Sequence, residues 1–570
     1  MQYAEENSAA EYSTPYTTVR GSLREFSSNE ERYRKLCMSE ACALYNSTTL
    51  QICSIYLHDR LERSLAHEQW PRATRNSQRN LSAFPILLAF NHSDMGNVFS
   101  PPSPPPTIAT SLHVLGDREA TVAMKREAFR HVQVEFAPVI NCSAAYSEEL
   151  RRVHALKYRV WEPPPEGFVQ NSKALASVVR GMIFGAAIGD ATGLATEFMS
   201  REQITEAYPD PNMIFMPGIE VYPDTHRLCF PRGDWTDDTD QLLLILMTLL
   251  ENEGQFNGPC FASHLSRWKD EGFVGLGDQG GSGLGQNTKQ VIQHPSFRDD
   301  PIQAADTVWR NGGCKAAPNG ALMRTAITGV AFFWDEGIVA ANTLAFCRAT
   351  HADPRCAASC IVVAECVRRL TLEAATGEID GDCKGNDTET ISDIIDSALG
   401  KAEALLKESY AIESLNRGAS AEDPHEVVQE LRKHSTATSL EALSLDDGRA
   451  IGYTFKCLGA GIWALRQIET SLNASKALLK SAHADSLKQQ EPFDENLSEA
   501  VAKILHAVTA AGGDADTNAA VAGALLGVAV GYENLPRKWL MALPYAEWME
   551  AWVGKLLFML RAPTNLRAGS

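Results

Sequence analysis

The sequence predicts an all-α protein, and three observations support that fold class. From Ser177 onward, long segments repeat apolar residues with helical periodicity, whereas alternating runs of β-branched residues are scarce. Glycine recurs at every fourth position, at Gly181, Gly185, Gly189 and Gly193, which favours a helix that packs very closely against a neighbour. Two separate stretches place several acids at the start of an apolar helix. We therefore expect helices throughout this part of the chain.

The whole chain has the composition of a soluble globular protein. It contains 570 residues, of which 44% are hydrophobic, and its formal net charge is −19. So acidic a protein is a poor candidate for non-specific binding to nucleic acid or to anionic membranes, because both depend on basic patches. The amino terminus lacks the apolar core of a signal peptide, and we judge no apolar run long enough to span a membrane. We expect an intracellular, cytoplasmic monomer, with a nuclear location left open.

The thirteen cysteines do not suggest a structural metal or a disulfide framework. They include no CxxC pair and no Cys/His set with zinc spacing. We interpret them as mostly free thiols in a reducing compartment. No Ser/His/Asp or Cys/His arrangement indicates covalent catalysis.

Residues 1–174 are predicted to form an amino-terminal extension of uncertain structure. The first 30 residues are polar and predicted to be disordered, and residues 31–65 have helical periodicity. Residues 109–160 mix helical and strand patterns, with alternation at 132–139. Proline-rich stretches at 100–106 and 163–165 indicate a stiff linker and a boundary before the catalytic region. We find no candidate chemistry in this extension.

The stretch RGDWTDDTDQLLLILMTLL, at 232–250, is the first acidic helix start. Its acids and hydroxyls are Asp234, Thr236, Asp237, Asp238, Thr239 and Asp240. One acid and one threonine would suffice to cap a helix. Several crowded carboxylates repel one another unless a cation compensates them, and a hard cation such as Mg²⁺ prefers oxygen ligands. For this stretch alone, capping and metal binding both stay open.

A second acidic helix start supports the metal interpretation. Asp514, Asp516 and Thr517 follow a double glycine and precede a helix of small residues. In an extended loop, residues two apart point the same way, so both carboxylates can converge. Upstream, Asp190 and Glu197 are seven residues apart and would share one helical face if the helix continued that far. Together these stretches predict a shared site with two metal ions.

Three further segments are candidates for substrate contacts. The glycine-rich segment 275–288 could turn backbone N–H groups towards phosphate, although a plain flexible loop is the commoner reading and no Walker lysine is present. Segment 312–325 places a turn before a helix, which is also an ordinary helix start. His351 lies at a helix end, where a lone histidine is more often structural than functional. Residues 371–445 are polar and look like a solvated insertion.

With these pieces in view, the chain resembles the ADP-ribosylglycohydrolase family. The matching pieces are GAAIGDATGLATEF, GDWTDDTDQLLL, NGALMRTA, the segment from Thr350 and His351 to Asp353, and GGDADTNAAVAGALLG, all in the family's order. The resemblance covers roughly residues 175–565. It implies a compact all-α helical bundle with a binuclear metal cleft at the helix ends.

The resemblance also implies roles for individual residues. Two Mg²⁺ ions, with Mn²⁺ as the alternative, would be held by Glu197, Thr236, Asp237, Asp238, Asp514, Asp516 and Thr517. Substrate contacts would come from Asp190, Gly283, Gly285, Asn287, Thr288, Asn319, Gly320, Met323 and His351. The substrate would be an ADP-ribosylated protein or an ADP-ribosyl small molecule.

The expected reaction is hydrolysis of the N- or O-glycosidic bond that joins ADP-ribose to an acceptor. Glu197 and Asp238 are the candidates for proton transfer to or from the reacting groups. Two alternatives stay open: a relative that binds ADP-ribose, or serves a structural role as the family's crystallin member does, without catalysis, and a hydrolase of another ribosyl nucleotide. All of the predicted metal-binding acids are present, which favours an enzyme.

Overall fold

The structure is a computed structural model that describes residues 114–115, 120–136, 144–377, 390–417, 422–481 and 493–564. All of these belong to one compact unit, Pro106–Ser570. The polar amino terminus, the helix predicted at 31–65 and the proline run at 100–106 lie outside the described residues. The predicted boundary between extension and catalytic region, at 174, stays a prediction.

The described residues form helices and no β-strand, which confirms the all-α prediction. In the first half of the chain the helices, with η marking the short 3-10 helices, are α4 (Val122–Phe136), α5 (Ala144–Ala155), α6 (Ser172–Gly193), α7 (Arg201–Ala207), η2 (Arg227–Cys229), α8 (Asp237–Glu251), α9 (Gly258–Glu271), η3 (Val274–Leu276), α10 (Gln286–Ile292), α11 (Pro301–Asn311), α12 (Leu322–Thr325), η4 (Ala326–Gly329) and α13 (Glu336–Arg348). The remaining helices are α14 (Pro354–Thr376), α15 (Ile391–Arg417), α16 (Pro424–Ser435), α17 (Leu440–Leu443), α18 (Thr454–Ser481), α19 (Glu495–Ala510), α20 (Ala515–Val530), η6 (Tyr532–Asn534), α21 (Arg537–Leu540) and α22 (Ala546–Met559).

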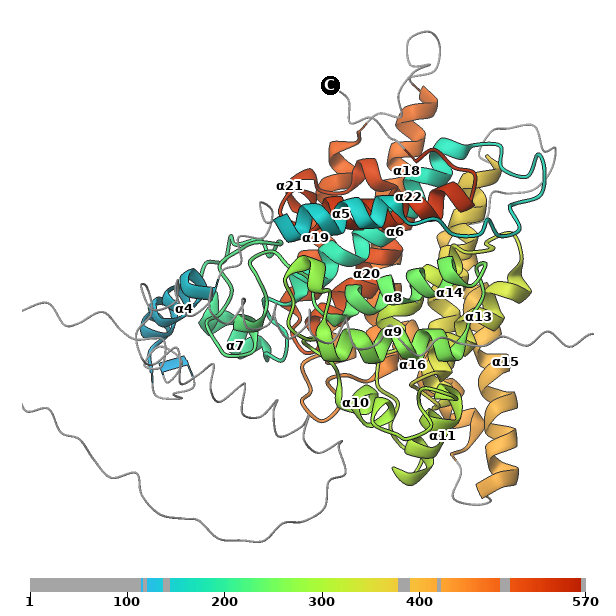
Figure 1. Cartoon of the computed structure of the whole chain (residues 1–570), viewed down its shortest axis with the longest axis horizontal. Coiled ribbons are helices and arrows are strands. Elements are labelled where there is room, and N and C mark those ends of the chain that lie inside the picture. The colour runs from blue at the N-terminus through green and yellow to red at the C-terminus, as the bar shows by residue number, and fades with distance from the viewer. Residues whose placement is uncertain are drawn as a thin grey trace, which may run out of the picture. The chain divides into compact units, whose positions relative to one another are not determined.

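Helices α6 and α20 form a closely packed pair in the middle of the bundle (Figure 1). An ideal Cβ on Gly185 would lie 2.2 Å from the carbonyl oxygen of Gly523, and one on Gly523 would lie 2.0 Å from the carbonyl oxygen of Gly185. Gly181 and Gly527 face each other in the same way, at 2.1 and 1.9 Å. Backbone therefore touches backbone, and the close packing expected from the glycine spacing is confirmed.

The register of this pair brings distant acids together. The two helices run antiparallel, so the last turn of α6 lies beside the first turn of α20, with Gly193 against the carbonyl oxygen of Ala515. Asp190 occupies the last turn of α6, and Asp516 occupies the first turn of α20. The sequence separates these two aspartates by more than three hundred residues, but the helix pair places them at one end of the bundle.

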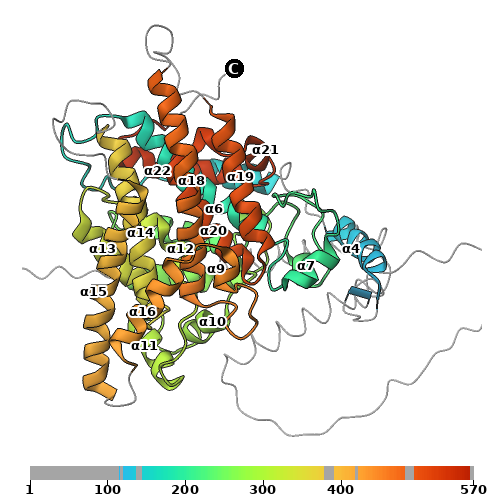
Figure 2. The ribbon, with the colours of Figure 1, turned by 180° about the vertical axis from the view of Figure 1, so that it is seen from behind.

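Other helices surround the pair. Helix α8 contacts both α6 and α20 from the side that faces the viewer in Figure 1, and α18 and α19 cover the opposite side, as Figure 2 shows. Helix α14 also packs against α6 and α20, and it carries α13 and α15 on its outer side. One continuous hydrophobic core joins these helices.

Helix α6 corrects the expectation that no apolar run could span a membrane. A window of this 22-residue helix reaches a mean hydropathy of 1.4, so by length and composition alone it could cross one. The protein buries 89% of that window. Because α20, α8 and α14 all pack against it, α6 is apolar on every side, which is the environment of a core helix.

Three local expectations differ from the structure. Helix α6 ends at Gly193, so Glu197 lies in the following turn and shares no helical face with Asp190. Asp514 and Asp516 do not lie in an extended loop, because Asp514 is the N-cap of α20. Residues 132–136, which alternate in polarity, belong to α4. In each case a helix boundary, set by packing rather than by periodicity, decides the local geometry.

The polar segment 371–445 contributes to the core, contrary to the expected solvated insertion. Helix α15 buries Ile394, Ile395, Ala398 and Leu406, and α16 buries Leu431. These side chains belong to the same hydrophobic core as α6 and α20. The segment looked polar because the outer faces of both helices are charged, and their averaged composition hides an amphipathic pattern.

The α6–α20 contact predicts that alanine substitutions at two glycines have opposite effects on the stability of the protein. We expect Gly185→Ala to destabilise the protein by about 2–3 kcal/mol, because the new methyl group must push two helix backbones apart. Gly400→Ala on α15 is the matched control: a Cβ there meets nothing within 4 Å, so the better helix propensity of alanine should stabilise by roughly 0.5–1 kcal/mol. Denaturant unfolding of both variants measures the difference. Equal stability of the two variants would contradict the close contact.

Candidate functional site

A carboxylate from α6 holds the first turn of α8. Asp190 Oδ1 accepts hydrogen bonds from Thr236 N and Oγ1 at 3.0 and 2.8 Å. Asp190 Oδ2 accepts from Thr239 N and Oγ1 at 3.0 and 2.6 Å. Thr236 is the N-cap residue of α8, but its hydroxyl makes no capping hydrogen bond to that helix. The helix is therefore capped from outside by Asp190, and simple capping by Thr236 does not explain the acids beside it.

Two groups of three carboxylates meet at this end of the bundle, and Asp516 belongs to both. One oxygen from each of Asp190, Asp238 and Asp516 lies within 4.8 Å of the other two. The same holds for Glu197, Asp514 and Asp516. Asp516 is therefore shared by two groups of carboxylates that could each hold a cation.

Some oxygens of the buried acids lack hydrogen-bond partners among the described residues. Asp238 Oδ1 and Asp516 Oδ1 have no hydrogen-bond partner among the described residues, and their side chains are only 2% and 3% exposed. Burial, followed by repulsion from neighbouring carboxylates, raises the pKa of both groups well above the ordinary value. A buried carboxylate that lacks donors is costly unless a cation compensates it. Because all the donors are hard oxygens, the residues fit the divalent cations that the family resemblance implies.

The other predicted ligands lie at the edge of this cluster. Each oxygen of Asp190 accepts two hydrogen bonds, so this carboxylate positions the first turn of α8 as well as belonging to one group of three acids. Thr236 Oγ1 lies 3.3 Å from both Asp238 Oδ2 and Asp516 Oδ2. The Thr517 hydroxyl hydrogen-bonds Asp238. Asp237 belongs to neither group of three, and its Oδ2 accepts from Gln241 at 2.6 Å.

Glu197 is held by two residues that the sequence analysis did not select. His226 Nε2 lies 2.6 Å from Glu197 Oε2, and Arg227 donates to the backbone carbonyl of Glu197. The hydrogen bond to Glu197 is the main cause that raises the pKa of His226. The His226 side chain is 31% exposed, whereas that of Glu197 is 5% exposed. His226 thus connects a buried carboxylate with solvent.

A buried chain of hydrogen bonds links the acidic cluster to His351. Gln241 donates to Asp237 and accepts from Arg324, which in turn donates to Thr350 Oγ1 at 2.5 Å. Thr350 Oγ1 lies 2.7 Å from His351 Nδ1. Gln241 and Arg324 were also missed by the sequence analysis. The signal that could have found them is a strongly polar residue inside an otherwise apolar helical stretch.

This chain fixes the orientation of the His351 ring. Burial, with Arg324 as a second cause, lowers the pKa of His351 well below its ordinary value, so the ring is neutral. A guanidinium can only donate, so the Thr350 hydroxyl accepts from Arg324, and both its own hydrogen and its second lone pair can bond His351 Nδ1. The other ring nitrogen, Nε2, lies beside Gly320, where an ideal Cβ would be 3.1 Å from it.

The glycine-rich segment reaches the acidic cluster. An ideal Cβ on Gly283 would lie 2.3 Å from Asp237 Oδ1, and its φ of +92° also favours glycine. Gly285 is the N-cap of α10. Asn287, in the first turn of that helix, donates to the backbone carbonyl of Thr350 at 2.9 Å. Thr288 is buried near Gly320, where a Cβ would lie 3.7 Å from its hydroxyl.

Among the remaining predicted substrate residues, two adjoin the cluster. Asn319 Nδ2 donates to Asp514 Oδ2 at 2.8 Å, and Gly320 lies beside His351. Met323 is buried on α12, and its backbone N–H bonds to the carbonyl of Asn319. Asp190, Gly283 and Asn319 thus lie directly at the acids, while Asn287, Thr288 and Gly320 lie around Thr350 and His351, and Met323 lies just behind Asn319. Their role towards a substrate stays a prediction.

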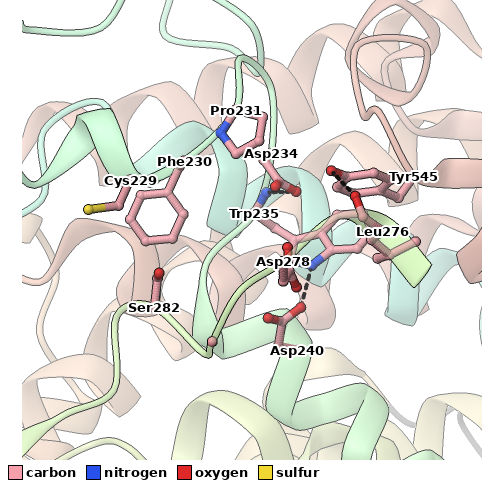
Figure 3. Close-up of a pocket in the computed structure, with 11 residues that line it drawn as sticks. Cys229, Phe230, Pro231, Asp234, Trp235, Asp240, Leu276, Asp278, Ser282 and Tyr545 are labelled. Carbon is pink, nitrogen blue, oxygen red and sulfur yellow. Dashed lines mark hydrogen bonds between the residues drawn. The ribbon is translucent and has the colours of Figure 1, made fainter. Parts of the chain in front are cut away.

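A second, separate set of acids lines a pocket next to the first turn of α8 (Figure 3). Asp234, Asp240 and Asp278 line a small pocket of about 40 Å³ that is partly open to solvent, together with aromatic walls such as Tyr545. Burial, reinforced by their mutual repulsion, raises the pKa of Asp234 and Asp240 well above the ordinary value. No lysine or arginine is among the described residues that line the pocket.

This pocket adjoins the acidic cluster through the glycine-rich segment. Ser282 lines the pocket, and the next residue, Gly283, abuts Asp237. Asp240 accepts hydrogen bonds from the indoles of Trp235 and Trp268, at 2.8 and 2.9 Å. The walls therefore combine carboxyl groups, whose ionised form a cation would favour, with aromatic surface, and an organic cation suits such an environment.

The protein is an all-α bundle in which the central helix pair brings buried carboxylates together at one end. This combination of fold and site identifies the class of protein. The chain belongs to the ADP-ribosylglycohydrolase family, whose model matches residues 171–565. This match leaves most of the amino-terminal extension uncovered and includes every residue named in the site.

Three relatives give the range of similarity. An uncharacterized protein of Archaeoglobus fulgidus is 25% identical over 377 residues, which cover 66% of this chain and 95% of the relative. The ADP-ribosylarginine hydrolase Tri1 of Serratia proteamaculans is 22% identical over 407 residues, covering 70% of this chain and 84% of the relative. The uncharacterized protein YegU of Escherichia coli is 29% identical over 91 residues, which cover 16% of this chain and 26% of the relative.

The buried acids predict an unusual pH dependence of the metal-free protein. Burial is the main cause that raises the pKa of Asp190 and Asp514 to about 6. An unfolded aspartate titrates near about 3.9, so the native protein binds more protons than the unfolded chain between about pH 4 and about pH 6. These groups therefore destabilise the metal-free protein increasingly as the pH rises through that window.

We expect the melting temperature in chelator to fall between about pH 4 and about pH 6, and Asp514→Asn to remove part of that fall. Thermal unfolding across this range measures the effect. Asp306→Asn, which alters an exposed carboxylate paired with Arg310, is the matched control. Its melting temperature should fall across the pH range by as much as that of the wild type. An unchanged pH dependence in Asp514→Asn would show that this carboxylate titrates normally.

Proposed function

We propose that the protein is a metal-dependent hydrolase that cleaves the glycosidic bond between ADP-ribose and an acceptor. The observation that carries this proposal is that two groups of carboxylates share Asp516, with unsatisfied buried oxygens on Asp516 and Asp238. Membership of the ADP-ribosylglycohydrolase family supports the substrate class. Glu197, Asp238, Asp514 and Asp516 would hold two divalent cations, with Mg²⁺ preferred over Mn²⁺.

The chemistry that such cations supply when bound is polarisation of ribose hydroxyls and of water. The chain's own residues would orient the substrate around them. His351 presents its Nε2 edge, and the glycine-rich segment presents backbone to an anionic substrate. Gln241 and Arg324 hold His351 and Asp237 in a fixed relation, so one hydrogen-bonded unit orients both an imidazole that faces the substrate and an acid of the cluster.

Glu197 is the residue that we propose for proton transfer. Its Oε2 accepts from His226, and no hydrogen bond to its other oxygen occurs among the described residues. In the proposed step, the oxygen of a water molecule bonds to the anomeric carbon while the acceptor leaves with the electrons of the broken bond. Glu197 takes the proton from the water and returns it to the leaving acceptor, and the partly exposed His226 connects Glu197 to solvent.

Release of free ADP-ribose from arginine-linked and serine-linked substrates tests this function. We expect release in Mg²⁺, none in chelator, and a fall of at least about 100-fold in kcat for Asp516→Asn, because that variant loses a carboxylate shared by both cation positions. Asp306→Asn should retain full activity as the surface control.

Two outcomes would contradict the proposal. Release that survives chelator and Asp516→Asn would sink the metal-dependent mechanism. No release from either substrate, with ADP-ribose still bound, would favour a binding protein or a hydrolase of another ribosyl nucleotide.

We further propose arginine as the acceptor. Tri1, a relative over most of the family domain, is an ADP-ribosylarginine hydrolase. The pocket lined by Asp234, Asp240 and Asp278 supports the same choice, because its carboxylates and aromatic walls suit a guanidinium better than a neutral serine.

The acceptor proposal predicts a selective effect on substrate binding. Asp278→Asn should raise KM for an arginine-linked substrate about fivefold, equivalent to ~1 kcal/mol for the loss of one partly buried charge, with little change in kcat. Steady-state kinetics on arginine-linked and serine-linked substrates measure the difference. Equal KM values for wild type and variant, or equal changes on both substrates, would rule out this pocket as an acceptor site.

A further inference from the structure

A cysteine, a histidine and a glutamate meet on the outer side of α8 and α9, at the end of α8 away from the acidic cluster. Cys260 and His264 are four residues apart on α9, so they lie on one face of that helix. Glu251 is the last residue of α8. The Sγ, Nε2 and carboxylate oxygen of these residues all lie within 4.8 Å of one another.

The distances suit a tetrahedral metal. Cys260 Sγ lies 3.3 Å from Glu251 Oε2, and His264 Nε2 lies 3.0 Å from the same oxygen. Around a tetrahedral Zn²⁺, bond lengths of about 2.0–2.3 Å place an oxygen roughly 3.5 Å from a sulfur ligand and roughly 3.3 Å from a nitrogen ligand. Each observed distance therefore needs to grow by only a few tenths of an ångström.

The ligand types point to zinc rather than to the cations of the acidic cluster. A thiolate and an imidazole are ligands of borderline or soft metals, whereas Mg²⁺ prefers oxygen. The Glu251 and His264 side chains are 39% and 23% exposed, so a fourth position faces solvent. We propose that Glu251, Cys260 and His264 form a zinc site that is independent of the acidic cluster and of the proposed hydrolase function.

The proposed site would stabilise the position of α9, a helix that contacts residues next to the acidic cluster. On the inner side of α9, Phe261 lies under the Arg324 guanidinium at 5.2 Å, and Trp268 donates to Asp240 at 2.9 Å. Zinc held by Cys260 and His264 on α9, and by Glu251 on α8, would join the two antiparallel helices at the end opposite the Trp268 contact. The site is thus placed to stabilise the α8–α9 hairpin rather than to take part in the reaction.

The proposed ligand set was not predicted by the sequence analysis. It combines a cysteine and a histidine of one helix with a glutamate of the preceding helix. The eight described cysteines are all free thiols, as expected. Cys260 differs from the seven others in sharing a carboxylate oxygen with a histidine.

Cobalt absorption of the full-length protein tests the proposal. The protein is stripped with chelator and titrated with Co²⁺ in excess Mg²⁺, which occupies hard-oxygen sites. We expect one equivalent of Co²⁺ to give a thiolate charge-transfer band and tetrahedral visible bands, and Zn²⁺ to displace both. Cys260→Ser should abolish the thiolate band and weaken Zn²⁺ binding at least about 100-fold, since changes around ligands alone cost 10–100-fold. Cys229→Ser, which alters another described thiol, is the matched control and should retain the band.

Thermal unfolding provides the second readout. Zn²⁺ should raise the melting temperature of the wild type and of Cys229→Ser, but not that of Cys260→Ser or His264→Asn, while all four proteins melt alike in chelator. Absence of a thiolate band in the wild type, or its persistence in Cys260→Ser, would overturn the proposal. Cys260→Ser could melt at a lower temperature than the wild type in chelator, which would show that the substitution itself destabilises the fold. The near-isosteric variant His264→Asn then decides: if Zn²⁺ still raises its melting temperature, the proposed zinc site is wrong.

Discussion

The close approach of α6 and α20 is the contact on which the site depends. Glycines on both helices allow backbone to touch backbone, so neither helix can slide along the other without meeting a larger side chain. This register places the end of α6 beside the start of α20, and with it Asp190 beside Asp516. Asp190 then fixes the start of α8 through four hydrogen bonds to two threonines. One backbone contact therefore sets the relative positions of all three acid-bearing segments.

The site concentrates charge that the rest of the fold must tolerate. Two helix N-termini, those of α8 and α20, direct their positive dipole ends towards the acids, which reduces the repulsion among them. Two buried oxygens still lack donors, and the pKa values of the carboxylates remain raised by burial and repulsion. The acids therefore destabilise the metal-free protein at the place where cations are proposed to bind. Functional sites commonly lower the stability of a fold in this way.

The acids and His351 are parts of one buried polar network rather than separate contacts. Gln241, Arg324 and Thr350 connect them, and Arg324 is positioned by the ring of Phe261 on α9. Arg324 Nε has no hydrogen-bond partner among the described residues, so the contact with the Phe261 ring is part of what holds this guanidinium in place. Helix α9 therefore matters to the site although none of its residues enters the acidic cluster. The Glu251, Cys260 and His264 cluster on its outer face would act on the same helix.

Sequence alone determined the fold class, the acid-rich helix starts and the family, because helical periodicity and motif order are local properties that survive without coordinates. It also predicted the close packing of α6, since glycine spacing has one strong physical meaning. It missed His226, Gln241 and Arg324, each of which has a hydrogen-bond partner 29 or more residues away, and it mistook α15 for a solvated segment. Only the tertiary structure decided where α6 ends, which of the described carboxylate oxygens stay unpaired and which residues orient His351, because each depends on contacts between segments that are distant in the chain.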